Sequence, residues 1–184
     1  MTVTNTANTT GGIADWRGWS VTTIPFWSCA AGAGAGREAF ANATNKVAVA
    51  DSDRFDDLQP YGGEMGSLLS TPAINISSRS GNLVVLSFDS NWRRSGNQTA
   101  TITARFDTGA PVQVLRWESA AGPNQKPTVN NERVSLAIAV PAAATTMTLD
   151  FDYIGDDNWY WAIDNISVFE GEATIPLASN ISPN

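Results

Sequence analysis

The chain has 184 residues, a length that suits one domain. Its formal net charge of −7 repels a phosphate backbone, which excludes nucleic acid as a partner. It contains no histidine, which excludes a Ser-His-Asp triad, a Cys-His pair and histidine-rich zinc sites. Its one cysteine, Cys29, allows no internal disulfide, and no run of about 18 apolar residues is present to span a membrane.

The two ends of the chain differ in composition from the part between them. Residues 1–12 are rich in Thr and Asn, and residues 172–184 are polar and carry two prolines. We expect both ends to be linker or disordered, with a single domain over residues 13–171. Residues 1–12 lack the basic and apolar regions of a signal peptide, so the signal of a secreted protein is expected outside this sequence.

Most elements expected between these ends are strands, because apolar and polar residues alternate with a period of two. One helical turn is expected within 39–45, and the residues 107–111 are typical of a hairpin turn. About ten strands with short loops predict an all-β fold, a two-sheet antiparallel β-sandwich of the jelly-roll type. The main expected strands, in chain order, cover residues 19–24, 46–50, 66–70, 83–89, 98–106, 112–117, 133–140, 146–153 and 160–169.

A carboxylate-rich segment follows the strand expected at 46–50. Asp51, Asp53 and Asp57 repel one another unless they are solvated or bridged by a hard cation, and calcium prefers several oxygen ligands. Asp164 lies on the Tyr160–Ala162 face of its strand, among apolar and aromatic neighbours, so its carboxylate needs a metal, an arginine or backbone N–H groups as partner. These four residues are our candidate ligands of one structural calcium ion, and a solvated acidic loop is the alternative.

Two tryptophans are placed on the other face of that strand. Trp159 and Trp161 are two residues apart and therefore point the same way. An exposed aromatic pair stacks well on sugar rings while polar neighbours bind the hydroxyl groups. We predict that both contact a ligand, and plain core packing is the alternative for each.

The loop before residue 98 offers a second group of candidate ligand-binding residues. Trp92 is followed by Arg93 and Arg94, which suits recognition of an acidic or sulfated glycan by an aromatic surface and planar guanidinium groups. Arg105, on the wetter face of the strand at 98–106, completes the set. The alternative for each arginine is a surface ion pair.

The order of several short segments resembles known jelly rolls. One group is similar to MAM and cleaved-adhesin domains, and another to cysteine-poor accessory domains of secreted bacterial proteins that occur beside phosphoesterases, glycoside hydrolases and polysaccharide lyases. The resemblance covers about residues 16–170 and implies a jelly roll, often with a structural calcium at positions that Asp51, Asp53 and Asp164 match. The segments are residues 68–74, 83–89 and 161–168 for the first group, and 47–53, 88–93 and 157–161 for the second.

These observations favour a non-catalytic carbohydrate-binding module for an acidic or an algal or plant polysaccharide. We expect a secreted, extracellular, monomeric module, attached to a catalytic domain in the same polypeptide. Two alternatives stay open: an adhesion or protein-interaction module, and a jelly-roll polysaccharide lyase or hydrolase. A hydrolase needs two carboxylates across a cleft, and a lyase needs a Tyr or Lys base with an arginine. The three tyrosines, Tyr61, Tyr153 and Tyr160, form no obvious set of that kind.

Overall fold

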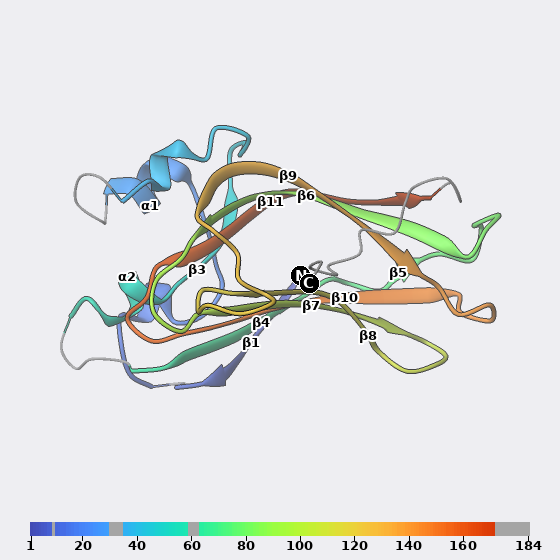
Figure 1. The fold of residues 1–184 in the computed structure, drawn as a ribbon, viewed down its shortest axis with the longest axis horizontal. Helices are drawn as coiled ribbons and strands as arrows, with labels where there is room; N and C mark the ends of the chain where they lie inside the picture. Colours follow the sequence, from blue (N-terminus) through green and yellow to red (C-terminus); the bar gives the residue numbers. More distant parts are fainter. Residues whose placement is uncertain (9, 30–34, 59–62, 172–184) are drawn as a thin grey trace.

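The structure is a computed structural model that describes residues 1–8, 10–29, 35–58 and 63–171. Two antiparallel sheets pack face to face, as Figure 1 shows, which confirms the predicted all-β sandwich. Among the described residues, no helix is both long and apolar enough to cross a membrane.

Among the described residues, sheet A has six strands and sheet B has five. Sheet A has the order β1 (Thr2–Ala7), β4 (Met65–Ser70), β10 (Thr146–Gly155), β7 (Thr99–Phe106) and β8 (Val112–Glu118), with β5 (Ile74–Asn75) pairing with β10. Sheet B has the order β2 (Ser20–Thr22), β3 (Val47–Asp51), β11 (Tyr160–Glu170), β6 (Leu83–Arg93) and β9 (Val129–Ala139). The short helices are η1 (Ala14–Trp16), α1 (Ile24–Cys29), η2 (Arg37–Ala39) and α2 (Ser52–Asp56).

The alternating segments form strands as expected. In β7, Ala100, Ile102 and Ala104 are fully buried, whereas the threonines between them are half-buried on the outer surface of sheet A. A strand with one buried face requires this period of two. The expected hairpin turn at 107–111 joins β7 to β8.

The start of the chain differs from the prediction. Thr2–Ala7 is not a linker but the edge strand β1, which pairs antiparallel with β4. Its alternating Thr and small residues have a strand pattern, but the polar composition concealed it. The tail at 172–184 lies outside the described residues, as do most of the glycine-rich residues at 30–36.

Aromatic side chains fill the space between the sheets. The Trp161 ring lies 5.4 Å from that of Trp19 and 5.9 Å from that of Trp117, measured between centroids, and it also contacts Phe88 and Phe151. Edge-to-face pairs at these distances are favourable arrangements for aromatic rings. Trp161 is therefore a central core residue.

A second, smaller core lies on the outer side of sheet B. Figure 1 shows α1 outside this sheet, near the end where β3 lies. Trp27 of α1 packs edge-to-face on Tyr160 at 4.8 Å, and Phe40, after η2, is buried as well. As a result β11 is buried on both faces from Tyr160 to Ile163.

Candidate functional site

Asp51 is neutralised by an arginine. Its fully buried carboxylate accepts hydrogen bonds from Arg37 Nε at 2.8 Å and Nη2 at 3.1 Å, from Trp27 Nε1 at 2.6 Å and from the backbone N–H of Arg54 at 3.0 Å. The last of these bonds caps α2 at its N-terminus. Burial raises the pKa of Asp51, and the hydrogen bonds and charge of Arg37 act in the opposite direction.

The four candidate calcium ligands do not form one cluster. Asp53 also binds Arg37, at 2.7 Å, and Asp57 binds Arg54. Asp51 pairs with Tyr160 across β3 and β11, whereas Asp164 lies four residues further along β11, where it accepts a hydrogen bond from the Thr44 N–H. Within the described ranges, no group of three or more His, Cys, Asp or Glu side chains could hold a metal ion. The four predicted ligands therefore do not form a single site, and the residues at Asp51 do not fit calcium, because Arg37 already binds this carboxylate. Calcium as a cofactor stays a prediction.

The predicted faces of β11 are also reversed. Trp161 points into the main core, while Tyr160 and Asp164 lie on the outer side of sheet B, in register with Asp51 and Asp89. Trp92 is fully buried beside Trp161 and Trp117 and donates from Nε1 to the Lys126 carbonyl. The prediction that Trp92 and Trp161 contact ligand is therefore wrong, and the packing alternative holds for both.

The remaining candidates have partners within the protein. The guanidinium of Arg93 stacks on the half-buried Trp159 ring, 4.0 Å from its centroid, and donates to the Ala35 carbonyl. Arg105 forms an ion pair with Asp150 at 2.5 Å on the outer surface of sheet A. Arg94 is exposed, and its backbone N–H donates to Thr128 Oγ1. The structure does not bring these arginines together around one ligand position.

A different surface combines features suited to ligand binding, and we call it the β6 face. It is the outer side of sheet B along β6 and the neighbouring strands, beyond the part that α1 and η2 cover. Three cross-strand rows, read from β11 through β6 to β9, form it: Phe169–Val85–Ala137, Ser167–Ser87–Ser135 and Asp164–Asp89–Arg133, with Asn165 beside the last row.

The charged row is held by a network of hydrogen bonds. Arg133 donates from Nη1 to Asp89 Oδ2 at 3.0 Å and from Nε to Ser87 Oγ at 2.8 Å. Asn165 Nδ2 donates to the same Asp89 oxygen at 2.8 Å. Asp89 is buried, yet the Arg133 side chain is 47% exposed, so the guanidinium is fixed in position and still reachable from solvent.

A β-bulge places Asn165 in this network. The register of β11 against β6 shifts between Asp164 and Ser167, and Asn165 has φ = 51° in the left-handed region. Asparagine tolerates this conformation better than most residues, because its short amide can bond locally. The bulge directs both Asp164 and Asn165 to the outer side of the sheet, where Thr44 and Asn42 bind them.

The opposite end of the β6 face is apolar. Phe169 is 49% exposed, and it lies in a row with Val85 and Ala137. The three rows span the five residues of β6 from Val85 to Asp89, about 13 Å along the strand, and three strands, about 10 Å across. An exposed aromatic ring, a row of hydroxyl groups and a fixed Asp–Arg–Asn group thus lie side by side on one surface.

Comparison with solved structures identifies the fold. No protein-family model and no curated protein matches this chain. The structure of TmCBM61 in complex with β-1,4-galactotriose is similar with a TM-score of 0.56 and 11% identity, over 92% of this chain and 88% of that one. The K1 cleaved adhesin domain of Lys-gingipain from Porphyromonas gingivalis W83 is similar with a TM-score of 0.53 and 15% identity, over 94% of this chain and all of that one.

The chain is therefore a jelly-roll β-sandwich of the kind that these two proteins share. The predicted resemblance to cleaved-adhesin jelly rolls is confirmed for the fold. The resemblance to MAM domains stays a prediction. At these identities the likeness concerns the fold and does not transfer a ligand or binding residues.

Sequence reasoning missed the residues of the β6 face for an identifiable reason. Arg133 and Asp89 each occupy one position of an alternating strand, where a surface ion pair is the ordinary expectation. A signal was present, since β6 carries the polar residues Ser87, Asp89 and Asn91 on the face opposite Leu86 and Phe88. Such polar residues at the centre of a buried strand indicate a surface that binds polar partners.

Proposed function

We propose that this protein is a carbohydrate-binding module and that its ligand lies on the β6 face. The observation that carries the proposal is the combination of the exposed Phe169 ring with the fixed Arg133–Asp89–Asn165 group on one surface. A sugar has apolar C–H faces that pack on an aromatic ring and hydroxyl groups that need both donors and acceptors. The similarity in fold to a module bound to galactotriose supports the same reading.

The charges on this face favour a neutral polysaccharide. Asp89 and Asp164 contribute two carboxylates, while Arg133 contributes one guanidinium. An acidic glycan would meet a net negative row. The sequence-based preference for an acidic glycan rested on Arg93 and Arg94, which lie elsewhere, so an acidic or an algal or plant polysaccharide stays a prediction for the same experiment to test.

Affinity electrophoresis against soluble polysaccharides tests the proposal. The panel contains β-1,4-galactan, xylan and mixed-linkage β-glucan as neutral polymers, and alginate and polygalacturonate as acidic ones. We expect retardation by at least one neutral polymer without release of reducing ends or unsaturated sugars, because a non-catalytic module binds the polymer and leaves it intact.

Two substitutions locate the ligand. Phe169→Ala and Arg133→Ala should each weaken binding about tenfold, equivalent to about 1.4 kcal/mol, while the Tm changes little for the exposed Phe169. The matched controls are Phe26→Ala, since Phe26 on α1 is 59% exposed, and Arg94→Ala. Equal binding by Phe169→Ala and the unchanged protein, or equal weakening by Phe26→Ala, would contradict the placement on the β6 face.

Secretion and attachment to a catalytic domain also belong to this proposal. The low share of charged residues and the many Thr, Ser, Asn and Gly residues support an extracellular module. The gene context of the chain and the culture fraction that contains the native protein test both points. A native protein confined to the cell interior would contradict them.

A further inference from the structure

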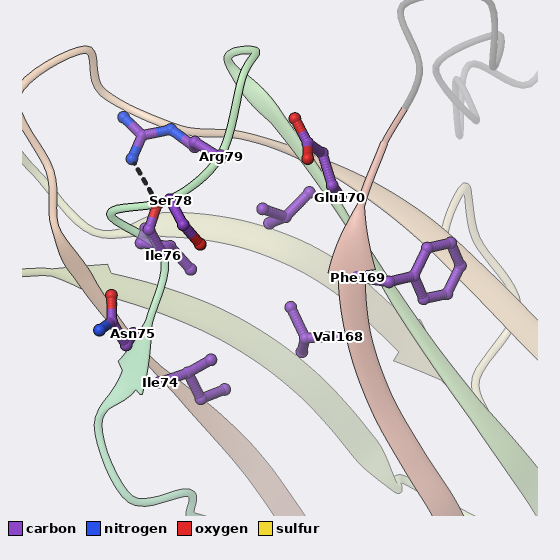
Figure 2. A pocket seen from close by; sticks show the side chains of 9 residues that line it. Ile74, Asn75, Ile76, Ser78, Arg79, Val168, Phe169 and Glu170 are labelled. Carbon is purple, nitrogen blue, oxygen red and sulfur yellow. Dashed lines mark hydrogen bonds between the residues drawn. The ribbon is translucent and has the colours of Figure 1, made fainter.

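A cavity lies at the end of the sandwich where β11 ends. It has a volume of about 200 Å³ and is formed by β5 and the loop after it, the start of β6 and the end of β11. Figure 2 shows Ile74, Ile76 and Val168 around this space, with Arg79 and Glu170 at its upper sides. This volume lies below the roughly 300–1,000 Å³ of sites for drug-sized ligands, so the space suits a ligand of about one sugar ring.

The walls are apolar and the rim is polar. Ile76 and Val84 are buried and belong to the core, while Ile74 and Val168 pack against it and remain partly exposed. Ser78 and Glu170 lie at the mouth and are exposed. This distribution matches a pyranose, which presents C–H groups on its faces and hydroxyl groups at its edge.

Both charged groups of the rim are held in place. Arg79 Nη1 donates to the carbonyls of Ile76 at 2.9 Å and Ala144 at 2.6 Å, and the first of these bonds is the dashed line in Figure 2. Glu170 Oε1 accepts from Ser80 N at 2.5 Å and from Ser80 Oγ. These hydrogen bonds from Ser80 lower the pKa of Glu170, which keeps it ionised as an acceptor for hydroxyl groups.

The cavity and the β6 face share one residue, Phe169. This residue lines the cavity, yet its ring is directed to the other side of β11, as Figure 2 shows, where it belongs to the apolar row of the β6 face. A single chain of sugars that stacks on Phe169 can therefore turn around the end of β11.

We propose that this cavity is a binding subsite for the neutral pyranose at one end of the polysaccharide that the β6 face binds. The inference rests on the proposed function and adds a preference for chain ends. One guanidinium and one carboxylate balance at the rim, so a charged sugar gains nothing there. The one-ring volume means that the subsite takes a terminal residue.

The methyl groups of the wall are natural reporters for the test. Galactose, glucose and N-acetylglucosamine are titrated separately into the methyl-labelled protein, and the NMR resonances of Ile74 and Val84 are followed. We expect saturable shifts with at least one of these monosaccharides, at millimolar Kd. The Arg133→Ala variant should keep these shifts, because Arg133 does not line the cavity.

Variants that fill the cavity complete the test. Val168→Phe occupies the space from a wall, and Ser78→Phe blocks the mouth from an exposed loop position, so at least one should fold with an unchanged Tm. Both should abolish the methyl shifts and weaken oligosaccharide binding about tenfold, whereas Val112→Phe on β8 of sheet A is the control and should change neither.

The outcomes separate the two proposals. The subsite is overturned if none of the three sugars causes a saturable methyl shift, or if Val168→Phe and Ser78→Phe leave oligosaccharide binding unchanged. Arg133→Ala still reports on the β6 face in either case, because Arg133 does not line the cavity. Absence of binding to every polysaccharide overturns the proposed function, and the subsite with it.

Discussion

The ion pair of Arg37 with Asp51 is the part of this fold most open to a quantitative test. Both side chains are fully buried, and Arg37 also donates to Asp53 and lies against the rings of Trp27 and Tyr160, 5.8 and 5.1 Å from their centroids. Replacing Arg37 by methionine keeps the length of the side chain but leaves the Asp51 carboxylate buried with only the Trp27 and backbone donors.

Loss of one partner of a buried ion pair costs about 3–5 kcal/mol. For a chain of this length, about 2–4 °C of Tm correspond to each kcal/mol, so Arg37→Met should lower the Tm by about 6–20 °C at pH 7. Burial already raises the pKa of Asp51 in the intact protein, and loss of Arg37 raises it further. Since a folded-state pKa above the unfolded value contributes stability that is lost as pH rises, the deficit of the variant should shrink as the pH falls.

Urea unfolding followed by tryptophan fluorescence at pH 7 and pH 5 measures both effects. Arg94→Met is the control, because Arg94 is exposed and its replacement should change the unfolding free energy by no more than about 0.5 kcal/mol. The double variant Arg37→Met, Asp51→Leu should regain most of the loss, since it removes the stranded charge. A deficit of Arg37→Met below about 1 kcal/mol, or one that is the same at both pH values, would refute the reasoning.

Three further predictions concern the core, acid stability and metal dependence. Trp161→Ala should lower the unfolding free energy by about 3–5 kcal/mol, because it leaves a cavity at the centre of the core. A variant with a normal Tm and lost sugar binding would instead show that Trp161 contacts the ligand. Partial burial raises the pKa of Asp150, but Arg105 outweighs it and holds this pKa below its ordinary value. The pair therefore stabilises the fold above about pH 4, and this contribution is lost as the pH falls further. Arg105→Gln should make the Tm fall less steeply at acid pH, and an unchanged acid dependence of the Tm would argue against the pair. Excess EDTA should leave the Tm unchanged, since Arg37 and not a metal neutralises Asp51; a fall in Tm would restore the calcium prediction.

The strands with one buried face were predictable from the sequence. For strands buried on both faces, the sequence predicted the position of the strand but not the direction of its side chains. In β7, β9 and β10 a solvent-facing row makes the alternation visible. In β11, residues from Tyr160 to Ile163 are buried on both faces, so the pattern could locate the strand but could not say which face meets the main core. The assignment of Trp161 to a ligand and of Asp164 to the interior followed from that ambiguity.

The partner of Asp51 was beyond local sequence patterns for a different reason. The sequence analysis offered Asp51 a hard cation or solvent as partner, and named an arginine or backbone N–H groups only for Asp164, which binds the Thr44 N–H. Arg37 comes from a short 3-10 helix that precedes β3, and only the folding of the segment around α1 and η2 onto sheet B brings it to Asp51. The β6 face was hidden in the same way, because Arg133 and Asn165 meet Asp89 from two different strands.

The two halves of β11 have different tolerance of sequence change. From Tyr160 to Ile163, each position is enclosed on its own side of the sheet, so nearly every substitution there carries a packing cost. From Ser167 to Glu170, the outward-pointing side chains contact solvent, and their replacement leaves the backbone pairing with β6 intact. Mutation can therefore vary the exposed side chains of one half of the strand in few and nearly neutral steps, while the other half keeps the fold constant.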